Sequence, residues 1–152
     1  MIMEKYVPPV GKFNADNIVF FAESAAFKGG YVNDRDIGMP NRNVFGTGAT
    51  VNSMSVDFSL PRLAKKLKIE FCGNEYVTPG QKLPLKIVLN GKTFFEGEKL
   101  LKHNECSAKT FDIPAGEFIQ SGNKLEIFNF SASTVWDTPY LRLYFIKIIP
   151  EY

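Results

Sequence analysis

The residues that build metal centres and disulfide frameworks are scarce in this sequence, which has two cysteines and one histidine among 152 residues. A structural zinc site needs several thiolate or imidazole ligands at suitable spacing, and His103 with two distant cysteines does not supply them. Cys72 and Cys106 allow two interpretations: two free, partly buried thiols, or one disulfide if the chain is exported.

Charge of one sign and long apolar runs are also missing. The net charge is +2 and lysines alternate with acids, so we expect no nucleic-acid partner. No apolar run approaches the roughly 20 residues of a membrane span, so we expect no membrane partner. The N-terminus lacks the basic and apolar segments of a signal peptide. The protein is therefore intracellular, or its leader was removed, or it is extracellular as part of a larger secreted protein.

Catalytic motifs are absent too. No serine lies in a G-x-S-x-G context, and no glycine-rich loop for phosphate stands between a strand and a helix. His103 lies among charged and polar residues, which is typical of a solvated side chain. A nucleophile pair of Cys106 with His103 is conceivable, but nothing nearby resembles a family motif for it. We expect that the protein is not an enzyme.

Apolar bulk is plentiful: hydrophobic residues make up 45% of the chain, and 14 of them are phenylalanine. A chain of this length normally forms one domain around one core. Pro8 and Pro9 favour an extended backbone. We therefore expect an extended N-terminal arm at residues 1–16 and a single domain at residues 17–152.

Strand periodicity dominates that domain. Between Val51 and Leu60, apolar and polar side chains alternate, as in a half-buried antiparallel strand. Asn90-Gly91 is a strong hairpin signal. About eight strands are expected, at residues 17–24, 51–60, 66–71, 85–89, 92–96, 111–114, 124–130 and 140–149. The first is apolar on both faces, which predicts that it is covered on both. The sequence predicts an all-β fold, an antiparallel β-sandwich or jelly roll.

Four segments are expected outside these strands. Residues 25–50 form a long region rich in Gly, Asn and Asp, with a short strand possible only at Tyr31-Val32. Residues 73–80 and 131–139 are expected as loops. Residues 98–106 fit either a helical turn or a loop.

Oxygen ligands are concentrated in the first of these segments. Asp34 and Asp36 share one side of an extended chain, and Asn33, Asn41 and Asn43 are close in sequence. Ca²⁺ prefers such ligands. The alternative is an Asn/Asp-rich loop that makes Asx turns.

Trp136 is the only tryptophan, and it lies in the expected loop before the last strand. Aromatic rings offer flat apolar faces to the C–H faces of sugars, and neighbouring polar groups can fix hydroxyls. Trp136, Asp137, Tyr31, Asn33 and Tyr140 are therefore the candidate ligand-binding residues. The alternative is that Trp136 fills the core or an edge.

Three short motifs occur in the same order as in a known fold family. Residues 85–92 (LKIVLNGK), 111–114 (FDIP) and 121–127 (SGNKLEI) resemble the galactose-binding-like jelly rolls. Residues 21–30 (FAESAAFKGG) are similar to the opening of carbohydrate-binding modules of families six and thirty-five, in which "EAE" begins the first strand and a Gly-Gly follows.

The resemblance implies the jelly-roll fold and a sugar-stacking aromatic in the loop that holds Trp136. It also implies a structural calcium held by acids. Here Phe21 replaces the first of those acids, Glu23 matches the second, and Leu143-Tyr144-Phe145-Ile146 stands where the family has an Asp. The metal candidates are Glu23, Asp34 and Asp36.

Two functions follow as hypotheses. The first is a non-catalytic carbohydrate-binding module for an oligo- or polysaccharide. The alternative is a protein–protein assembly or accessory module without a sugar ligand, which joins a partner domain or a homo-oligomer, in a larger complex or a phage-like particle.

Overall fold

The computed structural model describes residues 16–33 and 40–152 of the chain. The elements of regular secondary structure in these two ranges are all β-strands. These ranges contain no helix that is long and apolar enough to cross a membrane. The eleven strands are β1 (Ile18–Phe21), β2 (Phe27–Gly29), β3 (Tyr31–Asn33), β4 (Asn41–Val44), β5 (Ser53–Phe58), β6 (Lys66–Tyr76), β7 (Leu85–Leu89), β8 (Lys92–Gly97), β9 (Ser107–Ile113), β10 (Asn123–Asn129) and β11 (Tyr140–Glu151).

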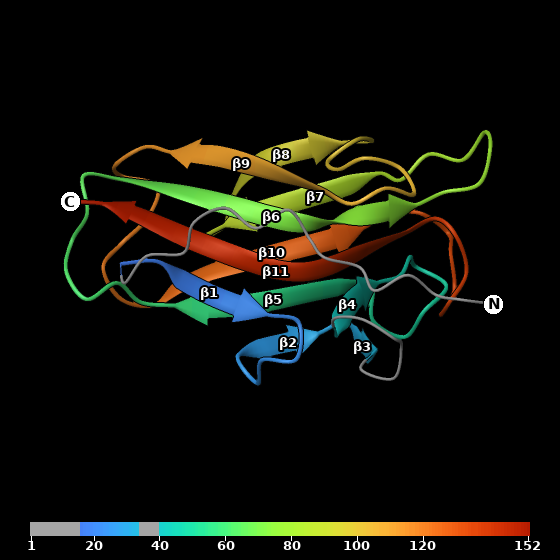
Figure 1. Ribbon diagram of the computed structural model, residues 1–152, viewed down its shortest axis with the longest axis horizontal. Coiled ribbons are helices and arrows are strands. Elements are labelled where there is room, and N and C mark those ends of the chain that lie inside the picture. Colours follow the sequence, from blue (N-terminus) through green and yellow to red (C-terminus); the bar gives the residue numbers. More distant parts are fainter. Residues whose placement is uncertain (1–15, 34–39) are drawn as a thin grey trace.

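Two antiparallel sheets lie face to face (Figure 1). One sheet has the order β3-β4-β11-β6-β9, and β1 also pairs with β11; we call it the front sheet. The other, the back sheet, has the order β2-β5-β10-β7-β8. The predicted all-β antiparallel sandwich is confirmed. The expected arm at residues 1–16 lies almost entirely outside the described residues.

The core fills the space between the sheets. In β5 and β10, the alternating apolar residues face inward and are buried, so both strands put one side on the core and one outside. Leu67, Ile69 and Phe71 of β6 join them from the front sheet, where all three are fully buried. The alternation in the sequence predicted these strands correctly because one face of each is solvated.

A bulge in β11 organises the front sheet. The register with β6 shifts between Leu143 and Phe145. Before the shift β11 pairs with β4 on its other side, and after it with β1. Gly73 lies opposite Leu143, and a Cβ there would come within 1.9 Å of the Arg142 carbonyl oxygen. The loop expected from residue 73 onward is therefore wrong at its start: this glycine lets β6 pass close to β11 and continue to Tyr76.

Three further expectations fail in the strands. Residues 25–50 hold β2, β3 and β4, of which only β3 was foreseen. β4 was missed because its first three residues are polar, although all are buried. β9 begins at Ser107 rather than Phe111. β1 packs Ile18 and Phe20 against the main core and Val19 against Cys72, Tyr144 and Phe145 on the other face. All four residues stay partly exposed, with Phe21 at 39%, so the expectation of full cover on both faces is wrong.

The segment of residues 98–106 is an irregular loop without a helical turn. The buried Glu75 carboxylate anchors it, because Oε2 accepts hydrogen bonds from the backbone N–H groups of Leu100 (2.8 Å) and Leu101 (3.0 Å). His103 Nε2 lies 3.1 Å from Glu75 Oε1, and its side chain is 37% exposed. The expectation of a merely solvated His103 is therefore wrong, and Cys106 lies against Cys72 instead of pairing with this histidine.

Candidate functional site

An aromatic cluster lies at one end of the front sheet, on the face turned away from the core. Its members are Tyr31, Phe45, Tyr76, Trp136 and Tyr140. Leu141 and Leu143 of β11 belong to the core, so alternation turns Tyr140 and Arg142 to the opposite face. Tyr76 is the register partner of Tyr140 and shares its side. The fold thus gathers rings from β3, β6, β11 and two loops at one place.

Phe45 is the centre of this aromatic cluster. It is fully buried, and its ring centroid lies 5.2 Å from Tyr31, 5.1 Å from Trp136 and 4.9 Å from Tyr140. The contacts are tilted or edge-on, which are the favoured geometries of aromatic pairs. Tyr140 also stacks on Tyr76 at 5.1 Å. The outermost ring, Trp136, is therefore backed by a packed aromatic layer.

Trp136 itself is 50% exposed and has a backbone φ of +61°. A bulky residue in the left-handed region is uncommon and costs roughly 1–2 kcal/mol. Such conformations persist where the surroundings over-determine them, and they concentrate at functional sites. The alternative interpretation, in which Trp136 fills the core or an edge gap, does not fit an indole that is half in solvent.

Buried polar groups fix the loop that carries Trp136. Ser133 Oγ accepts a hydrogen bond from the Gly46 N–H (2.8 Å) and donates one to the Pro139 carbonyl (2.8 Å). The Thr47 N–H donates to the Ser131 carbonyl at 2.7 Å. Asn129, which is also buried, donates from Nδ2 to the Val44 carbonyl at 2.9 Å. The first half of the loop is thereby tied to the end of β4 and the residues after it, and Ser133 ties that half to Pro139 at the end of the loop.

Two glycines make this close approach possible. A Cβ on Gly46 would lie 2.3 Å from the Ser131 carbonyl oxygen, and one on Gly48 would lie 2.6 Å from Thr134 Cγ2. Residues 46–48 therefore lie directly against the Trp136 loop. The tryptophan is held on a preformed support rather than on a free loop.

A polar group flanks the rings on the same face. Arg142 Nε donates to Asn43 Oδ1 at 2.9 Å, and Nη1 donates to the Tyr76 hydroxyl at 3.3 Å. The guanidinium carbon lies 4.7 Å from the centroid of the Tyr76 ring. Asn43 Nδ2 in turn donates to the Tyr31 carbonyl at 3.1 Å. The site thus combines flat apolar faces with a guanidinium that the fully buried Asn43 amide holds in place.

The structure brings most of the predicted ligand-binding residues together. Tyr31 and Trp136 both contact Phe45. Asp137 follows Trp136 and is exposed, and Asn33 lies two residues along β3 from Tyr31, on the same face. Tyr140 is only 8% exposed, so it supports Trp136 from beneath rather than offering a face to a ligand.

Among the described residues, the structure does not bring the metal candidates together into one site. Glu23 is exposed, and residues 16–33 and 40–152 contain no group of three His, Cys, Asp or Glu side chains that could hold an ion. Asp34 and Asp36 lie outside the described residues. Asn41 and Asn43 are buried, and the Asn43 amide donates to Asn41 Oδ1 at 2.9 Å.

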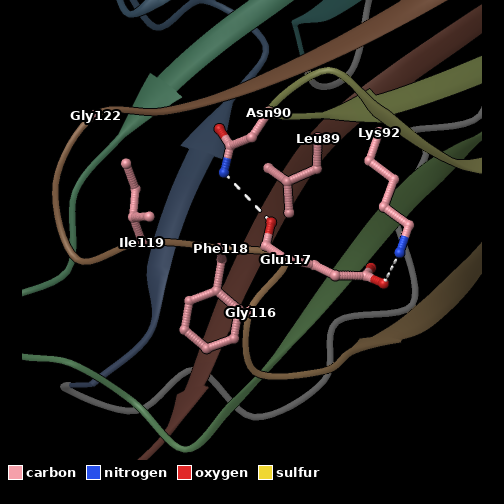
Figure 2. Close-up of a pocket in the computed structure, with 8 residues that line it drawn as sticks. All are labelled: Leu89, Asn90, Lys92, Gly116, Glu117, Phe118, Ile119 and Gly122. Atoms are coloured by element: carbon pink, nitrogen blue, oxygen red, sulfur yellow. Dashed lines mark hydrogen bonds and ion pairs between the residues drawn. The ribbon is translucent and has the colours of Figure 1, made fainter.

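A shallow pocket of about 360 Å³ lies at the opposite end of the sandwich (Figure 2). It adjoins Asn123 at the start of β10, whereas the Trp136 loop follows Asn129 at the other end of that strand. Figure 2 shows Lys92 paired with the Glu117 carboxylate and Asn90 directed at the Glu117 carbonyl. These polar groups already bind one another, and Asn90 Nδ2 also donates to Asn123 Oδ1 at 3.0 Å. The pocket residues thus stabilise the turns at this end.

Sequence reasoning missed several residues of the site, which are Phe45, Tyr76, Arg142, Ser131 and Ser133. It singled out Asn43 only as an oxygen ligand for Ca²⁺. Gly46-Thr47-Gly48 was noted only as part of an irregular region, although small residues are the signal of close packing. Nothing in the sequence joins Phe45 to Trp136, because their contact depends on β4 lying beside β11.

The fold is that of carbohydrate-binding modules. The chain is similar to a family 35 module from Cellvibrio japonicus, with a TM-score of 0.60, 11% identity, and coverage of 90% of this chain and 94% of that one. For a xylan-binding family 15 module the TM-score is 0.54 and the identity 13%, with coverage of 90% of this chain and 99% of that one. For a family 35 module described in complex with a glucuronic acid containing disaccharide, the TM-score is 0.60 and the identity 10%, with coverage of 89% of this chain and 94% of that one. No protein-family model and no curated protein matches the sequence. The resemblance inferred from the motifs is confirmed as a likeness of fold.

Proposed function

We propose that this protein is a non-catalytic domain that binds an oligo- or polysaccharide, with Trp136 as its stacking platform. One observation carries the proposal: a half-exposed indole is held in a left-handed backbone conformation on a loop fixed by buried hydrogen bonds. A preformed platform loses little freedom on binding, which favours recognition by an otherwise shallow site.

The groups around Trp136 suit a sugar. The apolar C–H face of a pyranose stacks on an aromatic ring, while its hydroxyls need hydrogen-bond partners at the edge. Asp137 and Asn33 supply such partners beside the aromatic cluster, and Arg142 lies on the same face of the sheet. Rings, amides and a guanidinium bind and orient a ligand, whereas glycoside hydrolysis uses two carboxyl groups that flank the scissile bond.

The neighbours in fold support the same function. One is described as xylan-binding, and another was determined with a glucuronic acid containing disaccharide. Plant cell-wall polysaccharides are therefore the first ligands to test. If the chain is part of a larger secreted protein, it acts outside the cell.

Isothermal titration calorimetry with a panel of xylan, glucuronoxylan, mannan, β-glucan and their oligosaccharides tests the proposal. We expect binding of modest affinity to one class, and loss of at least tenfold in affinity for Trp136→Ala. Phe130→Ala is the matched control, because Phe130 is an equally exposed aromatic residue (51%) at the start of the same loop. Silence across the panel, or equal binding by Trp136→Ala, would overturn it.

A Ca²⁺ ion remains a separate proposal for Glu23 with Asp34 and Asp36. Carboxylate oxygens are the ligands that this ion prefers. Titration of metal-free protein with Ca²⁺, followed by calorimetry, tests it. The control is a Glu23→Gln variant, in which binding should weaken. Equal heats for both proteins would remove Glu23 from the site.

One observation favours the second hypothesis, a protein partner. Exposed apolar side chains lie in or beside the Trp136 loop: Val135 within it, Phe130 at its start, and Val51 next to Asn52, whose carbonyl accepts from the Asn129 N–H. A contiguous exposed apolar patch is typical of a protein interface. In the titrations above, a protein interface predicts no saccharide binding by the wild type, and light scattering would then show an oligomer that Phe130→Ala dissociates.

A further inference from the structure

Cys72 and Cys106 lie side by side, with their sulfur atoms 4.0 Å apart. Cys72 belongs to β6, and Cys106 comes directly before β9, two residues ahead of Ala108, the register partner of Cys72. Residues two apart in an extended chain point to the same face of a sheet. The two thiols are therefore diagonal neighbours on adjacent antiparallel strands.

Their surroundings separate them from the main core. Cys72 is buried against Tyr144 and Phe145 on the outer face of the front sheet, and Val19 and the half-buried Cys106 pack against this group. No mechanism proposed above uses these thiols. Seven register pairs from Leu67 to Gly73 already join β6 to β9, so a covalent bond between the thiols is not needed to hold the two strands together.

We propose that Cys72 and Cys106 form an intramolecular disulfide when the protein folds in an oxidising compartment. The sulfur atoms need to close from 4.0 Å to a bond of about 2.0 Å, which rotation of two side chains on neighbouring strands can supply. The sequence left free thiols and a disulfide as alternatives, and the structure supplies the proximity that the second one requires.

The reaction proceeds by exchange with a small-molecule disulfide such as oxidised glutathione. The Cys106 thiolate attacks one glutathione sulfur, forms a mixed disulfide and releases one glutathione thiolate. The Cys72 thiolate then attacks the Cys106 sulfur and releases the second glutathione thiolate. Both protein thiols lose their protons to solvent, and the two electrons end on the glutathione pair.

The folded protein should react slowly. Burial raises the pKa of Cys72 to about 12 and that of Cys106 to about 11, so few thiolates exist at neutral pH. Oxidation is therefore expected during folding, before Tyr144, Phe145 and Val19 pack around the sulfurs. Once formed, the bond restrains the unfolded chain across a loop of 34 residues and raises the melting temperature by roughly 5–10 °C.

The test refolds the reduced full chain from urea in a glutathione redox buffer and, in parallel, incubates the folded reduced chain in the same buffer. After acid quench, denaturation and alkylation, mass spectrometry should find no free thiol in the refolded sample, a mass lower by two hydrogen atoms, and one peptide pair joined through Cys72 and Cys106. The folded sample should convert at least tenfold more slowly.

Cys106→Ala is the matched control. Its melting temperature should be the same with and without reductant, whereas that of the wild type should fall on reduction. Two alkylated cysteines in the refolded wild type would overturn the proposal, as would a disulfide-linked dimer in place of the intramolecular link. Cys72→Ala repeats the control from the other strand, so that a folding defect of one variant does not decide the result.

Discussion

The indole of Trp136 packs edge-on against the ring of Phe45, with centroids 5.1 Å apart and ring planes at 71°. Phe45 is fully buried and follows β4, whereas Trp136 is half exposed and precedes β11. The contact couples the ligand platform to the interior, because the same Phe45 ring also contacts Tyr31 and Tyr140. The stability of the loop and the position of the platform should therefore change together.

Ser133→Ala tests this coupling without touching the ligand surface. The substitution leaves the buried Gly46 N–H without its acceptor and removes a donor to the Pro139 carbonyl. A buried polar group without a partner costs about 1–3 kcal/mol. We expect urea denaturation to show a loss of this size, and calorimetry to show weaker saccharide binding by a variant that is still folded. Ser55→Ala, on the outer face of β5, is the control and should change neither quantity.

The backbone of Trp136 makes a second prediction. Its φ of +61° is strained for any residue with a side chain but natural for glycine. Trp136→Gly should therefore be more stable than Trp136→Ala by about 1 kcal/mol in urea denaturation, although both lose the platform. Equal stabilities of the two variants would mean that the loop relaxes to an ordinary conformation once the indole is gone.

Gly73 tests the account of the front sheet. A Cβ at this position would come within 1.9 Å of the Arg142 carbonyl oxygen. Because this oxygen belongs to the backbone, relieving the clash requires one of the two strands to shift. Gly73→Ala should lower the free energy of unfolding by about 3 kcal/mol or more, or prevent folding. Gly97→Ala, at the end of β8, is the matched control, because its nearest contact is an ordinary 3.4 Å to the Phe95 ring. Similar stabilities of both variants would contradict the tight crossing.

The buried Glu75 carboxylate predicts a pH dependence. Desolvation by burial raises the pKa of Glu75 above 4.5, although the N–H groups of Leu100 and Leu101 and the contact with His103 oppose the shift. The folded state then binds this proton more tightly than the unfolded state. The stability due to Glu75 is fully present below pH 4.5 and is lost as the pH rises through the raised pKa.

Glu75→Gln should remove this slope and keep an acceptor for the loop N–H groups. Urea denaturation from about pH 4 to about pH 8 should show the wild type losing stability relative to the variant as the pH rises. His103→Gln, measured in the same series, shows how much of the slope depends on the contact between His103 and Glu75. Parallel curves for wild type and Glu75→Gln would mean that the pKa of Glu75 is the same in the folded and unfolded states, which would contradict this prediction.

The strands that the sequence predicted best are those with one wet face. β5 and β10 alternate apolar and polar residues, and their boundaries were close to those observed. β4 escaped prediction because Asn41, Arg42 and Asn43 look like a loop, yet each is buried with polar partners. The Arg42 guanidinium donates to the Ala22 and Gly29 carbonyls, which replaces the water that a loop would offer. These hydrogen-bond partners lie in segments that are distant along the chain, so a local sequence pattern does not reveal them.

The candidate site was predicted in part for the same reason. Trp136 was recognisable as a lone tryptophan in a loop, and its exposure agrees with that. Tyr140 was expected to face a ligand, but its place beneath Trp136 is set by the register with Tyr76. The support of Ser133 and Phe45 follows from the pairing of β4 with β11, which links residues far apart in the chain. Local sequence therefore indicated the platform, and the topology supplied what holds it.

Trp136 is the only tryptophan in the chain, so its fluorescence reports on the proposed platform alone. Titration of the wild-type protein with the polysaccharide panel is the most direct measurement. If a sugar ring covers the indole, the emission will shift to shorter wavelength and saturate with the same dissociation constant as calorimetry. Emission that stays unchanged while calorimetry records saccharide binding would show that the ligand binds elsewhere, and would contradict the platform.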